Sequence, residues 1–225
     1  MNKISIYILL ILIYLGLSKS FSPSEKKAPY IPNEKVFPSY FYGAPISIIL
    51  LESFQTGFLI KTFFQKYKII HGFKHPETLI VRTSYSFWEK NKKNVGMSIF
   101  RRGERKNTES LIPMPPGILY IGDPAYGHWE IQDSGEKLWF FHRAYRHFPN
   151  IFNWNIFRPS EKFYETALTF LTHDKSYYGE NGEFGTEGSL TREKLEIKEK
   201  ESEDVIKSDL KNIIEKTFYI PKWNN

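Results

Sequence analysis

Three residues in the middle of the chain have side chains that could do chemistry together. Asp123 stands in a Gly-Asp-Pro turn, His128 follows five residues later, and Glu130 comes two residues after that. Residues two apart on a strand face the same side, so His128 and Glu130 can converge on one point. One imidazole and two carboxylates with an open position can hold a divalent ion and activate water. Asp123, His128 and Glu130 are therefore candidate catalytic residues and weak candidate metal ligands.

The same region also supports two other interpretations. On a helix, Arg143 and Arg146 would stand beside His142 and His147, and such a group of cations favours an anion over a metal. The structural alternative assigns Asp123 to its turn and leaves the histidines in solvent. We find no G-x-S-x-G, P-loop, G-x-G-x-x-G, H-E-x-x-H or EF-hand pattern and claim no resemblance to a known family. No cofactor is expected, with a divalent metal as the open alternative.

A second candidate site is the aromatic-rich stretch at 139–157, where arginines and asparagines alternate with aromatic rings. Sugars stack their apolar faces on aromatic rings, while nearby guanidinium and amide groups bind the hydroxyls. We expect most of the phenylalanines to be core. Exposure and burial are both open for Trp154, and the binding interpretation requires exposure. The predicted ligand-binding residues are Trp139, Arg143, Tyr145, Arg146 and Trp154.

Local patterns predict the elements that must position these residues. Segments rich in β-branched and aromatic residues predict strands, at 79–87, 95–101, 118–121, 128–131 and 138–141. The last two should form a hairpin, whose second strand either passes into a helix near His142 or gives way to a helix from Asp133. Apolar spacing predicts helices over 58–70 and 159–172. This mixture predicts an α+β fold with a small mixed or antiparallel sheet and flanking helices.

The N-terminal residues have the pattern of a secretory signal peptide. Lys3 precedes the uncharged run Ile4–Leu17, and Ser18 and Ser20 stand at the positions that signal peptidase reads. The run is shorter than the roughly 20 apolar residues that span a bilayer. We therefore expect cleavage after Ser20 and a periplasmic or secreted protein. The alternative is an uncleaved anchor through residues 4–17, which would then be the contact with a membrane.

Composition divides the 225 residues into four parts. These are a signal segment at 1–20, a linker rich in proline and aromatic residues at 21–44, a single globular domain at 45–188 and a charged C-terminal helix and tail at 189–225. The absence of cysteine excludes disulfides, thiolate metal sites and cysteine nucleophiles. The net charge of +6 at pH 7 permits attraction to an anionic partner without requiring one.

Together these features favour an exported cell-envelope protein that binds or scaffolds cell-wall or glycan polymer through its aromatic-rich surface. The first alternative is a metal-dependent hydrolase of wall peptide or glycan that acts through Asp123, His128 and Glu130. The second is a structural envelope protein without a ligand site. Aromatic and basic residues also suit single-stranded nucleic acid, but export argues against that partner. The sequence leaves the oligomeric state open.

Overall fold

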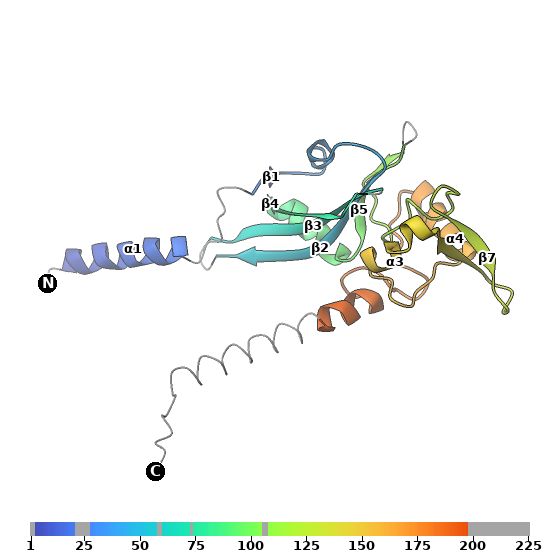
Figure 1. The fold of residues 1–225 in the computed structure, drawn as a ribbon. Coiled ribbons are helices and arrows are strands. Elements are labelled where there is room, and N and C mark those ends of the chain that lie inside the picture. Colours follow the sequence, from blue (N-terminus) through green and yellow to red (C-terminus); the bar gives the residue numbers. More distant parts are fainter. Residues whose placement is uncertain (1–2, 21–27, 58–59, 73, 105–107, 198–225) are drawn as a thin grey trace, which may run out of the picture.

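The computed structural model describes residues 3–20, 28–57, 60–72, 74–104 and 108–197. These residues form an α+β fold with a six-stranded sheet, a two-stranded sheet and helices, of which α1 extends away from the sheets (Figure 1). The larger sheet has the order β1-β4-β3-β2-β5-β6 and is mixed, because β1 pairs with β4 in parallel and its other pairs are antiparallel. The predicted fold class is confirmed.

The elements have the following bounds. The strands are β1 (Tyr30–Ile31), β2 (Ile46–Thr56), β3 (Thr62–His71), β4 (Glu77–Thr83), β5 (Ser98–Arg102), β6 (Glu109–Ser110), β7 (Gly127–Ile131) and β8 (Lys137–Phe141). The α-helices are α1 (Lys3–Ser20), α2 (Tyr85–Asn91), α3 (Phe148–Ile151) and α4 (Glu161–Thr172). The 3-10 helices are η2 (Phe37–Tyr40), η3 (Lys92–Asn94) and η4 (Arg143–Tyr145). A further helix covers residues 189–197.

The long hairpin of β2 and β3 forms the middle of the larger sheet. Residues Ile46–Leu50 are all buried, because β2 lies between β3 and β5 and both faces of the sheet are covered there. The pairing runs from Ile46 opposite His71 to Thr56 opposite Thr62. It shifts by one residue between Leu50 and Glu52, so that a β-bulge interrupts the ladder at this point.

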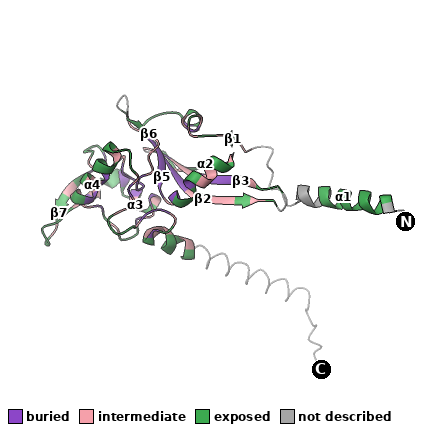
Figure 2. Cartoon of the chain, turned by 180° about the vertical axis from the view of Figure 1, so that it is seen from behind, coloured by how far each residue is buried: buried purple, intermediate pink, exposed green. Residues whose placement is uncertain are grey.

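Two apolar clusters cover the two faces of this sheet. Side chains alternate along β2, so Ile48 and Leu50 belong to one cluster and Ile49 to the other. The first cluster also contains Phe37 and Phe41, which the N-terminal segment brings onto the sheet. The second contains most of the buried aromatic residues of the C-terminal half, and the buried segments of Figure 2 meet there. The segment interpreted as a linker thus contributes side chains to the core.

The predicted helix at 58–70 is wrong, because Thr62–His71 form β3; residues 58 and 59 lie outside the described residues. Tyr67 and Ile70 fit a helical spacing, but in the strand they face opposite clusters. The strand pairs with β2 on one side and with β4 on the other, which satisfies its backbone groups. Packing in the centre of a sheet outweighs the local helical pattern.

The predicted strand at 118–121 is also wrong, because the chain turns there. Gly117 adopts a φ of 89° and Gly122 a φ of 79°, values that favour glycine. The Tyr120 N–H donates to the Gly117 carbonyl at 2.8 Å, within a turn rather than to a neighbouring strand. Tyr120 is nevertheless fully buried, which explains the apolar run that resembled a strand.

The strand predicted over 79–87 is confirmed only as far as Thr83, because Tyr85–Asn91 form α2, and the remaining strand and helix predictions are confirmed with shifted ends. β4 stops at Thr83, because the Ser84 hydroxyl accepts the Phe87 N–H at 3.2 Å and begins α2. β5 corresponds to the strand predicted over 95–101, and β7 and β8 form the predicted hairpin. That hairpin passes into η4 directly after His142. α4 corresponds to the helix predicted over 159–172.

α1 is exposed along the part whose side chains are described. Residues Ile4–Leu15 all face solvent and are green in Figure 2. Among the described residues, the structure contains no helix with the length and apolarity needed to cross a bilayer. Removal of α1 as a signal peptide stays a prediction.

Arg101 is a buried cation that ties β5 to the following loop. Its guanidinium donates to the Ser98 carbonyl at 2.9 Å, to the Ser110 hydroxyl at 3.2 Å and to the Ile112 carbonyl at 2.8 Å. Burial lowers the pKa of Arg101 to about 9, so the guanidinium stays charged at neutral pH. A buried charge is tolerated when several oxygens accept from it.

We expect Arg101→Ala to lower the free energy of unfolding by about 2–4 kcal/mol, because it leaves buried carbonyls without a donor and creates a cavity. Urea denaturation followed by circular dichroism measures this loss. Arg146→Ala is the matched control, since Arg146 is exposed and its truncation should change stability by less than about 0.5 kcal/mol. Equal effects of the two variants would contradict a structural role for Arg101.

Candidate functional site

His128 and Glu130 lie together on β7, as their spacing predicts. The His128 Nε2 and a Glu130 carboxylate oxygen are 2.9 Å apart, and both side chains are about half exposed. The His142 ring stacks on His128 with 5.5 Å between centroids. The His142 Nε2 is 3.0 Å from the Pro124 carbonyl, which accepts its proton and holds the ring. These groups form a solvent-facing polar cluster on the small sheet.

The structure does not bring Asp123 into this cluster. The Asp123 Oδ1 accepts the Ala125 N–H at 2.9 Å and closes the turn before β7. Among the residues that the structure describes, no three His, Cys, Asp or Glu side chains are grouped to hold a metal ion. The geometry therefore places two of the three candidate catalytic residues together, and a metal at this point stays a prediction.

The aromatic residues predicted to bind a ligand are buried. Trp139, Tyr145 and Trp154 all belong to the second apolar cluster, and Trp154 is only 1% exposed. The Trp154 Nε1–H donates to the Pro116 carbonyl at 3.1 Å, so its polar atom is satisfied inside the protein. The binding interpretation required an exposed Trp154. The structure corrects this expectation, because the Trp154 side chain is buried.

Backbone geometry explains why a tryptophan between two asparagines points inward. Asn153 has a φ of 58° and Asn155 a φ of 50°, so the chain reverses on each side of Trp154. Gly117 lacks a Cβ where the Trp154 ring and Phe152 pack against it. The sequence of 139–157 alone therefore does not predict the burial of Trp154, because it indicates neither the chain reversal nor the contact with Gly117.

The two arginines of the predicted site have a different environment from its aromatic residues. Arg143 and Arg146 are exposed around η4, while Tyr145 between them is buried. Cationic groups and aromatic faces therefore do not share an open surface here. A sugar ring cannot reach the faces of Trp139, Tyr145 or Trp154 without unfolding this part of the core.

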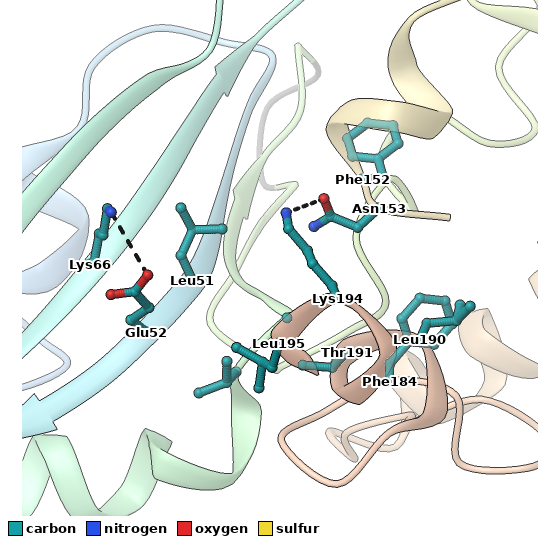
Figure 3. Close-up of a pocket in the computed structure, with 12 residues that line it drawn as sticks. Leu51, Glu52, Lys66, Phe152, Asn153, Phe184, Leu190, Thr191, Lys194 and Leu195 are labelled. Carbon is teal, nitrogen blue, oxygen red and sulfur yellow. Dashed lines mark hydrogen bonds and ion pairs between the residues drawn. The ribbon is translucent and has the colours of Figure 1, made fainter. Parts of the chain in front are cut away.

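A cavity that the sequence did not indicate lies between the β2–β3 hairpin and the helix at 189–197 (Figure 3). Its volume is about 200 Å³. The strands supply one wall, the helix supplies the opposite wall, and Phe152 and Asn153 after α3 close one side. The apolar lining residues are Leu51, Val95, Phe152, Phe184, Leu190 and Leu195. The charged lining residues are Glu52, Lys66 and Lys194.

Two local features of the backbone open this space. The β-bulge lies between Leu50 and Glu52, so both Leu51 and Glu52 line the cavity although they are adjacent in a strand. On the opposite wall, Gly96 lets Thr191 approach the backbone closely, because a Cβ there would collide with the threonine side chain. The first turn of the helix is thereby seated against the loop before β5.

The segment that leads into this helix is fixed by hydrogen bonds to η3. The Thr186 hydroxyl donates to the Lys92 carbonyl at 2.6 Å, and the Thr186 N–H donates to the Lys93 carbonyl at 3.0 Å. The Tyr178 hydroxyl donates to the Asn94 Oδ1 at 2.9 Å. The helix at 189–197 is therefore positioned by hydrogen bonds between the segment before it and η3, which is far away in the sequence, as well as by the β2–β3 hairpin.

Positive charge dominates the polar side of the cavity. Lys66 forms an ion pair with Glu52 at 3.8 Å, and the Lys194 ammonium donates to the Asn153 side-chain carbonyl. Beside them, the Lys68 ammonium donates to the Ile151 carbonyl at 2.9 Å. Burial, and then the charge of Lys194, lower the pKa of Lys68 to about 8. Two ammonium groups and one carboxylate thus line the cavity, and a third ammonium group, that of Lys68, lies near Lys194.

The sequence does not reveal this cavity, for a physical reason. Its walls come from segments far apart in the chain, and they meet only through the pairing of β2 with β3 and the packing of 189–197. One signal was present: Lys66 and Lys68 interrupt an apolar segment at a spacing of two. In a strand this spacing places both on one face, whereas the predicted helix separated them.

Comparison of the chain with family models, with curated protein sequences and with solved structures gives no match. The function must therefore be argued from the chemistry of the cavity and its surroundings.

The charge on Lys68 should make stability depend on pH. Its pKa is about 8 in the folded chain and near the ordinary 10.5 when unfolded, so the unfolded state binds more protons between these values. Stability of the natural protein, measured relative to Lys68→Met, should therefore rise as the pH increases from about 8 toward 10.5. Below that window the difference should be constant.

Urea denaturation of both proteins at matched pH values between 7 and 10 measures this difference. Other titrating groups cancel in the comparison, because the two chains share them. A difference that does not change with pH across the window would show that Lys68 is not held in a desolvated site.

Proposed function

We propose that this chain is an exported binding protein that holds a small organic anion with an apolar body in the cavity between the β2–β3 hairpin and the helix at 189–197. One observation carries the proposal: apolar walls and two ammonium groups, those of Lys66 and Lys194, line the same cavity. Binding sites for small molecules combine these features, with apolar lining for affinity and a few polar groups for orientation.

The arrangement of the lysines supports an anion over a neutral or cationic ligand. Burial is the main cause of the lowered pKa of Lys68, and the nearby charge of Lys194 lowers it further, so the two ammonium groups are close enough to repel each other. A carboxylate placed at the polar side would relieve this repulsion and accept charge-assisted hydrogen bonds. Its apolar body would cover side chains such as Leu51 and Phe184 that line the interior.

Binding is better supported than catalysis. His128 and Glu130, the candidate catalytic pair, lie on the small sheet and do not line the cavity. Their side chains face solvent, whereas general acids and bases act on a substrate held in place. Capture of wall polymer by the 139–157 stretch loses its basis because its tryptophans are buried.

Export is a part of the proposal that depends on the N-terminal segment alone. The apolar run Ile4–Leu17, the preceding Lys3 and the small residues at 18 and 20 support a signal peptide. The lack of cysteine is compatible with an oxidising compartment, since no thiol is present to react there. These features together support a periplasmic or secreted binding protein.

Calorimetry with octanoate tests the ligand class, because octanoate has one carboxylate and a short apolar chain. We expect octanoate to bind, octan-1-ol to bind more weakly and octylamine not to bind. Lys66→Met and Lys194→Met should each weaken octanoate binding about tenfold, the effect of losing a charged hydrogen bond. Lys175→Met is the matched control, since Lys175 is exposed and lies outside the cavity. Equal binding of octanoate and octylamine, or no binding, would overturn the proposal.

Intact-mass analysis of protein isolated from its natural cells tests export. We expect a mature chain that begins at Phe21, found outside the cytoplasm, because signal peptidase reads the small residues at 18 and 20. A full-length chain in the membrane fraction would support the anchor alternative instead. A full-length chain in the cytoplasm would contradict both.

A further inference from the structure

One end of the large sheet gathers exposed aromatic, aliphatic and basic side chains. Strand register defines this end: Phe63 pairs with Thr83, Arg82 pairs with Tyr30, and the turn between β2 and β3 lies just beyond Thr62. α2 begins directly after Ser84, so its first turn lies at the same end. α1 also extends beyond this end of the sheet (Figure 1).

Three aromatic rings from β3 and α2 form a cluster here. The Phe63 ring lies 5.2 Å from Tyr85 and 5.1 Å from Trp88, between centroids. Tyr85 is 59% exposed and Trp88 is half-buried. This cluster belongs to neither of the two core clusters. Its aromatic surface is thus presented to the outside of the protein.

Ile60, in the turn between β2 and β3, extends this apolar surface. It is 79% exposed, and the next residue, Lys61, is exposed as well. A single exposed isoleucine is ordinary on a soluble protein. Here the isoleucine lies next to a lysine and at the same end of the sheet as a tyrosine and a tryptophan. Together these residue types are typical of surfaces that bind at a membrane interface.

Two basic groups lie over aromatic rings at this end of the sheet, one on each face. The Arg82 guanidinium lies 4.9 Å from the Tyr30 ring centroid, and the Lys92 ammonium lies 5.9 Å from that of Trp88. Lys92 also pairs with Glu89. Within the described part of the chain, no carboxylate forms an ion pair with Arg82 or Lys61. Lys61 and Arg82 are therefore exposed cations that can contact an anionic surface, whereas Lys90 and Lys92 are paired with carboxylates.

We propose that this end of the sheet, formed by Ile60 and Lys61 before β3, the end of β4 and the start of α2, docks onto a lipid bilayer with anionic headgroups. Tyr85 would sit at the headgroup level, where amphipathic rings are stable, with the Trp88 ring packed behind it, and Ile60 would enter the acyl boundary. Lys61 and Arg82 would remain at the phosphates while their stems cover apolar surface. The proposal is independent of the ligand cavity, since none of these residues lines it.

A label attached at Ile60 tests docking in the full chain. The sequence has no cysteine, so Ile60→Cys creates a single attachment point for an environment-sensitive fluorophore. Ile156→Cys is the matched control, because Ile156 is 93% exposed and lies after α3, away from the sheet end. Each labelled chain is mixed with vesicles of phosphatidylglycerol and phosphatidylcholine, or of phosphatidylcholine alone.

We expect emission at position 60 to rise about threefold with the anionic vesicles, because the label leaves water for an apolar environment. Emission at position 156 should not change. Lys61→Gln and Arg82→Gln, each made in the labelled Ile60→Cys chain, should weaken vesicle binding about fivefold, the effect of one basic residue at an anionic surface. High salt should reverse the response.

Several results would overturn the proposal. No response at position 60, even when the chain sediments with vesicles through α1, would show that this end stays in water. Equal responses at positions 60 and 156, or equal responses to anionic and neutral vesicles, would show unspecific adsorption. A response to insoluble cell-wall polymer but not to vesicles would assign the surface to a glycan partner instead.

Discussion

The antiparallel pairing of β2 with β3 is the constraint on which the rest of this structure depends. β2 lies between β3 and β5, and its segment Ile46–Leu50 is buried on both faces. Its backbone groups are satisfied only by neighbouring strands, and its side chains must be covered by two separate layers. The N-terminal segment with Phe37 covers one face, and the aromatic C-terminal half covers the other.

The same hairpin places the two proposed binding surfaces. Its bulge turns Leu51 and Glu52 toward the helix at 189–197 and opens the ligand cavity on one face. Its turn carries Ile60 to the end of the sheet, beside the aromatic cluster around Phe63. A ligand site and a lipid-docking surface can therefore occupy different parts of one rigid element, and each can be altered without the other.

Local signals predicted the β7–β8 hairpin and α4. The hairpin has a glycine turn between two β-rich segments, although a helix from Asp133 stayed open as an alternative, and α4 has an apolar stripe after a proline. β3 was predicted as a helix because Tyr67 and Ile70 have a helical spacing. Pairing with β2 on one side and β4 on the other stabilises the extended backbone instead. The segment at 118–121 was predicted as a strand because its residues are apolar. It is a turn with a buried Tyr120, and a buried turn is as apolar in sequence as a buried strand.

By itself the sequence determined the α+β class, the N-terminal apolar segment, the absence of thiol chemistry and the neighbouring positions of His128 and Glu130 on β7. These follow from composition or from residues close together in the chain, where backbone geometry alone sets the distances. Only the tertiary structure decided that Trp154 is buried and that Lys66 and Lys194 face one cavity. Both depend on contacts between distant segments, and the free energy of packing those segments is not encoded in any local pattern.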